Sequence, residues 1–196
     1  MNTGLLIFVS GPSGVGKSTI CRRLASELPA EFAVSATTRE GKPQDAQGKK
    51  YEFVDEATFR RWLETGELLE YAYVFGNWYG TLKTPVQEGL AAGRTILLEI
   101  DVQGAIQVHK LFPHAMGVFI LPPSEQDLLT RLRGRGRDDE ATIMRRFAEA
   151  QQEIRTAEAS GVYDLLVVNE DHGVEKTTDV IMKASRKFRG DEPTLF

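Results

Sequence analysis

Residues 11–18 have the residue types and the spacing of a loop that binds phosphate. Their sequence is Gly-Pro-Ser-Gly-Val-Gly-Lys-Ser, and its glycines allow a tight turn whose backbone N–H groups point at an anion. Lys17 can reach the β- and γ-phosphates of a nucleotide, and the Ser18 hydroxyl can be a ligand of Mg²⁺. We therefore expect this chain to bind a nucleoside triphosphate. The expected contacts are Gly11, Pro12, Ser13, Gly14, Val15, Gly16, Lys17, Ser18 and Thr19.

A second candidate for phosphate binding is the segment 131–137, Arg-Leu-Arg-Gly-Arg-Gly-Arg. Guanidinium groups so close together repel one another unless an anion or water lies among them. Arginine grips phosphate oxygens with two parallel bonds and offsets charge as a phosphoryl group moves. The glycines would let the segment close over a nucleotide and open again. The alternative for this segment alone is a solvated basic turn.

Two carboxylates, Glu99 and Asp101, follow one another at the end of a predicted strand at 95–100. Residues two apart on a strand point to the same side, and the carboxyl edge of a parallel sheet is where such folds bind ligands. We expect this pair to hold the waters of a Mg²⁺ ion or to accept hydrogen bonds from a base. Burying two unpaired carboxylates for structure alone would be costly.

The elements that position these groups follow from apolar patterns. Residues 5–9 before the loop indicate a buried strand, and apolar residues follow Lys17 at helical spacing until Pro29. Near-continuous apolar runs also occur at 95–100, 117–121 and 165–168, as in the strands of a covered parallel sheet. Helical patterns separate them, the longest at about 139–159 and the last at about 174–187. The fold class is therefore α/β, a doubly wound core that follows a phosphate loop.

About fifty residues, 33–83, do not fit this alternation and are too many for a passive loop. They contain β-like pieces at 51–54 and 68–75 and a short helical pattern at 58–63. We interpret them as an inserted lobe that binds a substrate. An arginine, phenols, hydroxyls and a carboxylate in this lobe suit a sugar phosphate with a polar base, although surface loops often have such a composition.

Length, composition and net charge limit the classes of protein to which this chain can belong. The chain has 196 residues, enough for one substantial core, and its 41% hydrophobic and 27% charged residues are typical of a soluble globular protein. Its formal net charge of −4 argues against nucleic-acid binding. We expect no membrane span and no signal peptide, and the lone Cys21 fits a reducing cytoplasm. The three histidines have no metal-ligand or triad spacing.

Taken together, these motifs resemble the guanylate kinase family over nearly the whole chain. The phosphate loop alone is generic, but the set is specific. It comprises 10–19, Ser-Ala-Thr-Thr-Arg (35–39), Gly-Lys-Lys-Tyr-Glu-Phe-Val (48–54), Leu-Glu-Tyr-Ala (69–72), Gly-Asn-Trp-Tyr-Gly-Thr (76–81), Leu-Glu-Ile-Asp-Val-Gln-Gly-Ala (98–105), Arg-Leu-Arg-Gly-Arg-Gly (131–136) and Val-Val-Asn-Glu-Asp (167–171).

The resemblance implies one domain and one reaction. A P-loop core (1–32, 84–124 and 151–190) would carry a GMP-binding lobe (33–83) and an arginine-bearing lid (125–150). The implied reaction transfers the γ-phosphoryl group of ATP to GMP, with dGMP as a further acceptor and Mg²⁺ as the cofactor. The implied partners are these nucleotides alone, and oligomeric state stays open.

The resemblance also assigns roles by position. Ser35, Glu70, Thr81 and Asp101 would contact guanine; Arg39, Tyr51 and Tyr79 would contact the GMP phosphate; Glu99 would complete the GMP site. Lys17, Arg135 and Arg146 would surround the transferred phosphoryl group, and Asn169 would lie near adenine.

The chain departs from the family pattern after Arg39. The family usually has Thr-Thr-Arg-x-Pro-Arg-x-Gly-Glu, whereas this chain has Thr-Thr-Arg-Glu-Gly-Lys-Pro-Gln-Asp at 37–45. Lys42 therefore replaces a second phosphate-binding arginine with a point charge, and Gly41 replaces a stiffening proline. This puts the affinity for GMP in question. His172 also replaces a residue that is typically apolar.

Two alternatives stay open at this stage. One is a non-catalytic interaction module, because guanylate-kinase-like domains of scaffolding proteins keep the fold without the chemistry. The other is a related kinase that acts on a different phosphorylated acceptor, such as a ribose bisphosphate. The intact Gly16-Lys17-Ser18 weighs against the first, and the carboxylates Glu70 and Asp101 weigh against the second.

Overall fold

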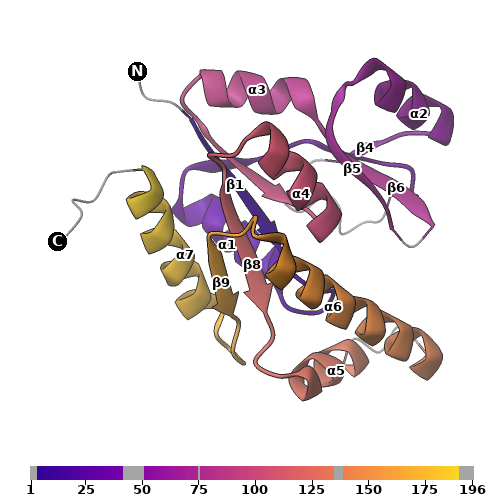
Figure 1. Ribbon diagram of the computed structural model, residues 1–196, viewed down its shortest axis with the longest axis vertical. Coiled ribbons are helices and arrows are strands. Elements are labelled where there is room, and N and C mark those ends of the chain that lie inside the picture. The colour runs from indigo at the N-terminus through magenta and orange to yellow at the C-terminus, as the bar shows by residue number, and fades with distance from the viewer. Residues whose placement is uncertain (1–3, 42–50, 75, 135–138, 190–196) are drawn as a thin grey trace.

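A five-stranded sheet forms the centre of the computed structural model, which describes residues 4–41, 51–74, 76–134 and 139–189. Its strands are all parallel, in the order β2-β7-β1-β8-β9. Figure 1 labels three of them, β1, β8 and β9. The chain places β2 and β7 on one side of β1 and β8 and β9 on the other. The strand order therefore switches beside the loop that follows β1, which is where such sheets bind ligands. The bounds are β1 (Leu5–Ser10), β2 (Ala30–Phe32), β7 (Thr95–Glu99), β8 (Met116–Leu121) and β9 (Leu165–Val168).

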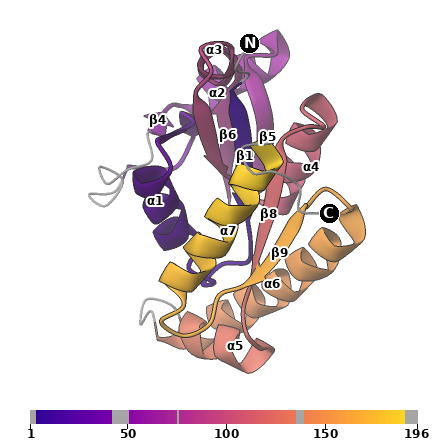
Figure 2. The same cartoon turned by 90° about the vertical axis from the view of Figure 1, so that its left-hand side faces the viewer.

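Helices cover both faces of this sheet. They include α1 (Lys17–Glu27), α3 (Lys83–Ala91), α4 (Val102–Leu111) and α7 (Val174–Arg189). Alternate residues of β1 face opposite sides: Ile7 and Val9 share a core with α1 and α7, while Leu6 and Phe8 share one with α3 and α4. Figure 2 shows α1 and α4 on opposite sides of β1. The predicted doubly wound core is confirmed.

Residues between β2 and α3 form a second, smaller sheet in the order β4-β3-β6-β5. Its elements are β3 (Ser35–Thr37), β4 (Tyr51–Phe53), α2 (Glu56–Thr65), β5 (Leu68–Val74) and β6 (Asn77–Leu82). The β-like pieces and the helical pattern predicted here correspond to β4, β5 and α2. The sequence did not indicate β3 or β6, because β3 has three residues and β6 contains Gly80, which interrupts the apolar alternation.

Two further helices are α5 (Glu125–Arg133), which lies beyond the carboxyl end of the central sheet, and α6 (Glu140–Ser160), which runs from there back over the sheet, where Ala157 packs with Phe119 of β8 (Figure 1). Leu128 and Leu132 of α5 pack against Ile143 of α6. The predicted arginine cluster is only partly described. Arg131 pairs with Asp171 at 2.8 Å and Arg133 pairs with Glu140, so two of its guanidinium groups have carboxylate partners within the chain. Arg135, Gly136 and Arg137 lie outside the described residues.

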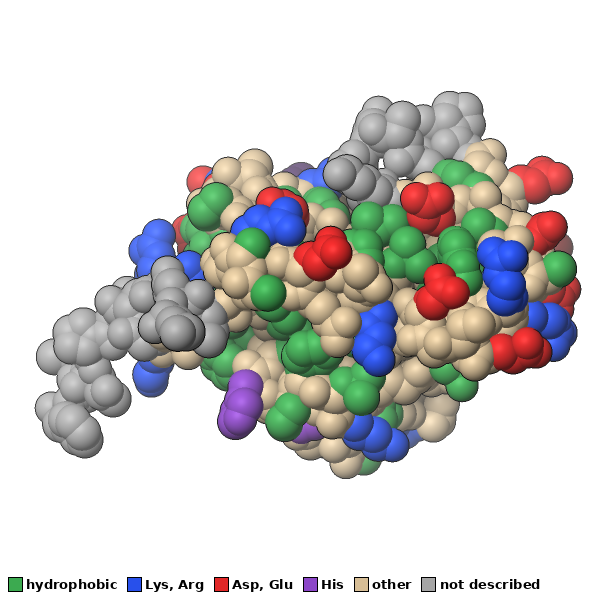
Figure 3. Space-filling view, turned by 90° about the horizontal axis from the view of Figure 1, so that it is seen from above, with side chains coloured by type: hydrophobic (Ala, Val, Ile, Leu, Met, Phe, Trp, Pro, Cys, Tyr) green, Lys and Arg blue, Asp and Glu red, His purple; other side chains and the backbone are tan. Residues whose placement is uncertain are grey.

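The charged surface is mixed where Figure 3 shows it. Lys and Arg side chains lie among Asp and Glu side chains on that face, with apolar groups between them. Within the described ranges, every helix is too short or too polar to cross a membrane.

Candidate active site

The loop between β1 and α1 has the backbone geometry that its glycines predict. Gly14 and Gly16 have φ angles of 94° and 96°, the left-handed region that favours glycine. A Cβ on Gly16 would lie 2.7 Å from Nδ2 of Asn169, so that position has no room for a side chain. Because α1 begins at Lys17, the unpaired N–H groups of its first turn face the loop and favour an anion there.

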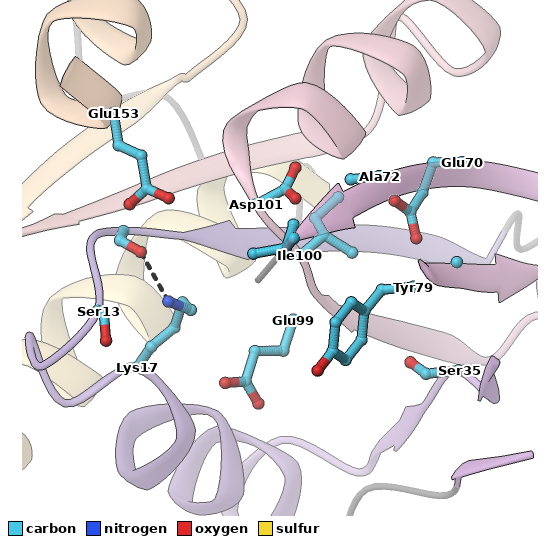
Figure 4. A pocket seen from close by; sticks show the side chains of 13 residues that line it. Ser13, Lys17, Ser35, Glu70, Ala72, Tyr79, Glu99, Ile100, Asp101 and Glu153 are labelled. Carbon is cyan, nitrogen blue, oxygen red and sulfur yellow. Dashed lines mark hydrogen bonds between the residues drawn. The ribbon is translucent and has the colours of Figure 1, made fainter. Parts of the chain in front are cut away.

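Lys17 and Ser18 each have a defined hydrogen-bond partner within the protein. The Lys17 ammonium donates to the carbonyl of Gly11 at 2.6 Å, which holds it across the loop (Figure 4). The Ser18 hydroxyl donates to Oε1 of Glu99 at 2.5 Å. Because the Ser18 hydroxyl is the donor in this bond, the lone pairs of its oxygen stay available to a cation.

A cavity of about 280 Å³ connects this loop to the smaller sheet. The loop contributes Gly11, Ser13 and Lys17, the edge of the central sheet contributes Glu99, Ile100 and Asp101, and α6 contributes Glu153; the smaller sheet contributes Ser35, Glu70, Ala72, Val74, Tyr79 and Gly80. Figure 4 shows Lys17 and Glu153 at one end of this space and Glu70, Tyr79 and Ser35 at the other. A neighbouring cavity of about 370 Å³ is lined by the loop residues 12–14 and 16–19 and by Arg22.

Glu70 is a buried carboxylate at the far end of the cavity. It is only 5% exposed, and its Oε1 accepts a hydrogen bond from the Thr81 hydroxyl at 2.6 Å. Oε2 lies against Gly104 of α4, where a Cβ would approach to 2.3 Å. Glu70 is thus fixed between β6 and α4. A carboxylate fixed in this way can accept hydrogen bonds from a ligand with neighbouring N–H donors.

The prediction that Glu99 and Asp101 lie on one face of a strand is wrong. β7 ends at Glu99, and Asp101 is the N-cap of α4, where its Oδ1 accepts the backbone N–H of Gly104 at 2.8 Å. Aspartate is favoured at this position because it satisfies a free N–H of the first turn. Asp101 therefore has a structural partner, although both carboxylates still line the cavity.

Comparison with known proteins decides the family. The guanylate kinase family model matches residues 3–185. The guanylate kinase of Trichodesmium erythraeum is 44% identical over 190 residues, which are 96% of this chain and 100% of that protein. The guanylate kinase of Aromatoleum aromaticum is 49% identical over 169 residues, 86% of this chain and 81% of that protein. This chain belongs to the guanylate kinase family.

A solved structure agrees with this assignment. The crystal structure of guanylate kinase from Anaplasma phagocytophilum superimposes with a TM-score of 0.76 at 33% identity, covering 96% of this chain and 88% of that chain. The α/β fold with a parallel sheet flanked by helices is the fold of that guanylate kinase.

The residues that the family resemblance assigns to the phosphate of GMP are brought together only in part. Tyr79 lines the cavity, whereas Arg39 and Tyr51 lie beside each other and are not among its lining residues. The Arg39 guanidinium lies 5.1 Å from the centre of the Tyr51 ring and donates to the Glu40 carbonyl at 2.8 Å. Lys42 lies outside the described residues.

Beyond the phosphate loop, two of the residues assigned to ATP or to catalysis lie in the described part of the chain, Arg146 and Asn169. Arg146 is half-buried on α6, two turns before Glu153, and Arg135 lies outside the described residues. Asn169 is 4% exposed beneath the phosphate loop. Its Nδ2 donates to the Val15 carbonyl at 2.8 Å, and its Oδ1 accepts from the Thr177 hydroxyl at 3.3 Å. Both ends of this amide are therefore used inside the protein. Its assignment to adenine stays a prediction.

Sequence reasoning missed Glu153. Its carboxyl group lines the cavity near Lys17, and burial raises its pKa to about 7; Lys17 opposes this shift, while Asp101 and Glu149 add to it. Its position seven residues after Arg146, on the same side of α6, was the available signal. Tyr163 lies deeper, and burial raises the pKa of its hydroxyl well above the usual range.

Proposed function

We infer that this protein transfers the γ-phosphoryl group of ATP to the phosphate of GMP, forming ADP and GDP. Family membership supports the reaction. The observation that carries it for this chain is the cavity itself, which joins Lys17 of the phosphate loop to the buried carboxylate of Glu70. Such a space suits a donor phosphate at one end and an acceptor base at the other.

We propose that Glu70 recognises guanine, with Ser35, Thr81 and Asp101 around the base. Guanine carries N1–H and a 2-amino group, two adjacent donors that a carboxylate can accept. Adenine has a bare N1 and no 2-amino group, so it would leave Glu70 unsatisfied. The bond from Thr81 and the contact with Gly104 support this role, because they fix the position of the carboxylate.

We propose that catalysis rests on positioning and on charge. A phosphate oxygen of GMP is already an anionic nucleophile, so no strong general base is needed. Lys17, Arg146 and Arg135 would offset the charge of the transferred group. Arg39, Tyr51, Tyr79 and Lys42 would hold the acceptor phosphate, and Glu99 would complete that side of the site.

Mg²⁺ fits the donor groups near the loop. The Ser18 hydroxyl with the Glu99 carboxylate beside it offers the hard oxygen ligands that this ion prefers. We propose that Ser18 binds Mg²⁺ directly, with water and phosphate oxygens as the remaining ligands. When bound, the ion neutralises charge on the phosphate oxygens of ATP. We also propose that the reaction takes place in the cytoplasm, since the chain has a single cysteine, Cys21, and therefore cannot form a disulfide within itself.

The two alternatives are not favoured. An interaction module has no need for the ordered Lys17 and Ser18 contacts of the phosphate loop. An acceptor without a base, such as a ribose bisphosphate, has no need for a carboxylate buried as deeply as Glu70.

The experiment that tests this function measures ADP release with a panel of acceptors. Purified protein with ATP and Mg²⁺ is given GMP, dGMP, AMP, UMP or ribose phosphates in a coupled assay. We expect rapid ADP release with GMP and dGMP alone. Release that is fastest with a ribose phosphate would support the related kinase, and no acceptor-dependent release would support the interaction module.

A further inference from the structure

The edge of the smaller sheet is covered by a helix of the core. β5 is the last strand in the order β4-β3-β6-β5, so only one of its edges pairs with another strand. Unpaired backbone groups on an edge strand need other partners. On the open side of β5 lies α4, and the contact of Gly104 with Glu70 shows how closely the two elements approach.

Gln107 of α4 satisfies both backbone groups of Tyr71, the residue after Glu70. Its Nε2 donates to the Tyr71 carbonyl at 2.8 Å, and its Oε1 accepts the Tyr71 N–H at 3.2 Å. Two residues of paired antiparallel strands exchange N–H and C=O in the same way. The side-chain amide of Gln107 thus makes the two hydrogen bonds that a neighbouring strand would make.

The same end of α4 holds both carboxylates assigned to guanine. Asp101 caps the helix through the N–H of Gly104. Gly104 touches Glu70, and Gln107 lies one turn further along the same side. Glu70 belongs to β5 of the smaller sheet and Asp101 is the N-cap of α4, so their separation depends on how α4 and β5 are joined. Gln107 is a side chain of α4 that bonds to β5 directly.

We propose that Gln107 is a positioning residue, which fixes Glu70 relative to Asp101 by tying Tyr71 to α4. This rests on the proposed function, because it assumes that the two carboxylates bind guanine. The tie holds β5 beside α4 at a defined separation, so less has to be ordered around the base when GMP binds. It also makes α4 a third connection between core and lobe, beside the two chain crossings at about 33 and 84.

The proposal predicts different effects on the KM for GMP and on the KM for ATP. Without the tie, β5 and Glu70 can shift while the phosphate loop on β1 and α1 stays as it is. The KM for GMP should therefore rise and the preference for guanine over hypoxanthine should fall, because hypoxanthine lacks the 2-amino group. The KM for ATP should stay within error of the native value.

The main test compares Gln107→Leu with the native protein. Leucine keeps the approximate size of the side chain and removes both bonds to Tyr71. We expect the KM for GMP to rise about tenfold, as two lost hydrogen bonds imply, with the KM for ATP unchanged. Gln87→Leu is the matched control, because Gln87 is exposed on another core helix, α3, and should leave both constants unchanged.

A second readout does not depend on activity. Hydrogen exchange followed at the Tyr71 amide should be about tenfold faster in Gln107→Leu, since its N–H loses its acceptor, and unchanged in Gln87→Leu. If the native protein has no activity with GMP, the proposed function fails while this exchange still tests the tie.

Gln107→Glu is a second variant, which keeps the proposal testable if Gln107→Leu does not fold. Glutamate keeps the acceptor for the Tyr71 N–H and loses the donor to the Tyr71 carbonyl, so the KM for GMP should again rise. An unchanged KM for GMP with unchanged Tyr71 exchange in a folded variant would overturn the proposal. Equal increases in the KM for GMP and for ATP would also overturn it, because they indicate a general loss of structure.

Discussion

Replacement of Lys17 tests, at the scale of one residue, whether the phosphate loop is the donor site. Its ammonium spans the loop to the Gly11 carbonyl and is solvated enough that its removal should not unfold the protein. We expect Lys17→Ala to lower kcat by about a hundredfold or more, because charge on the transferred phosphoryl group is no longer offset. Circular dichroism checks the fold and the coupled assay checks turnover. Near-normal turnover would show that the loop is not the donor site.

Glu70 tests base recognition at the same scale. Replacing it by glutamine keeps its shape and its acceptor for the Thr81 hydroxyl, but puts an amide donor opposite the donors of guanine. We expect Glu70→Gln to lower kcat/KM for GMP by about a hundredfold and to reduce the preference for GMP over AMP. Thr81→Val should have a smaller effect in the same direction. A variant with unaltered preference would remove Glu70 from the base site.

Glu153 gives a dependence on pH that can be measured without substrate. Its pKa is raised from 4.5 to about 7, so the folded protein holds this proton more tightly than the unfolded chain does. Its contribution to stability is therefore complete below pH 4.5 and is lost as the pH rises to about 7. Glu153→Gln cannot ionise. Its free energy of unfolding should exceed that of the native protein by about 3 kcal/mol at pH 8 and by little at pH 4.5. Urea titrations at both pH values measure this, and a difference that does not change with pH would contradict the assignment.

Elements were predictable from sequence where local pattern decides the structure. The apolar runs at 5–9, 117–121 and 165–168 each lie within one residue of a strand, because strands covered on both faces are apolar throughout. β2 and β3 escaped prediction since each has three residues and is held by pairing with distant strands. Asp101 was placed in a strand because the acidic residue that caps a helix directly follows the strand that precedes it.

The candidate site likewise has residues that could be predicted from the sequence and residues that could not. Lys17 and Ser18 were predictable because a single loop and the start of one helix place them. The cavity near Glu153 and the bond from Gln107 to Tyr71 depend on how helices pack on distant strands. The spacing of Glu153 from Arg146 puts both on one side of α6, but it does not say that this side faces a cavity. Glu70 was assigned through the family motif, while its burial between Thr81 and Gly104 emerges only in the fold.

Gly104 tests how α4 and β5 fit together as elements. A Cβ at this position would lie 2.3 Å from Oε2 of Glu70, which is the far end of a flexible side chain. We expect Gly104→Ala to displace that carboxylate and to raise the KM for GMP about tenfold. The melting temperature should not fall much, because alanine favours the helix by about 1 kcal/mol over glycine. Kinetics with both substrates and thermal unfolding check this, and an unchanged KM for GMP would mean that Glu70 does not recognise the base from this position.

At the scale of the whole molecule, we expect two extensions to move, the lobe (33–83) and the lid (125–150) that the family resemblance implies. Water must be kept from the γ-phosphoryl group, or ATP would be hydrolysed without an acceptor. We therefore expect the lobe and the lid to approach each other when both substrates bind. The hinges would lie near Ala33 and Thr84 and near Gly134; the further expected hinge, Gly136, lies outside the described residues.

Distance probes can measure this closure. Spin labels on cysteines introduced at the exposed Glu64 of α2 and Gln126 of α5 report the separation of lobe and lid, since the native Cys21 is buried. The distance should shorten with GMP and a non-hydrolysable ATP analogue together, and less with either alone. The same distance under all four conditions would show that the site does not close.

The central claim is that a guanine site and an ATP phosphate site share one cavity, and the ratio of kcat/KM for GMP to that for AMP tests it most directly. Both values are measured with the native protein at saturating ATP and Mg²⁺, with GDP and ADP identified by chromatography. A site that depends on buried polar contacts rejects an analogue lacking its donors by about 10⁴-fold, so GMP should be preferred by that order. Comparable values for GMP and AMP would contradict the assignment of Glu70 and Asp101 to guanine, and with it the proposed function.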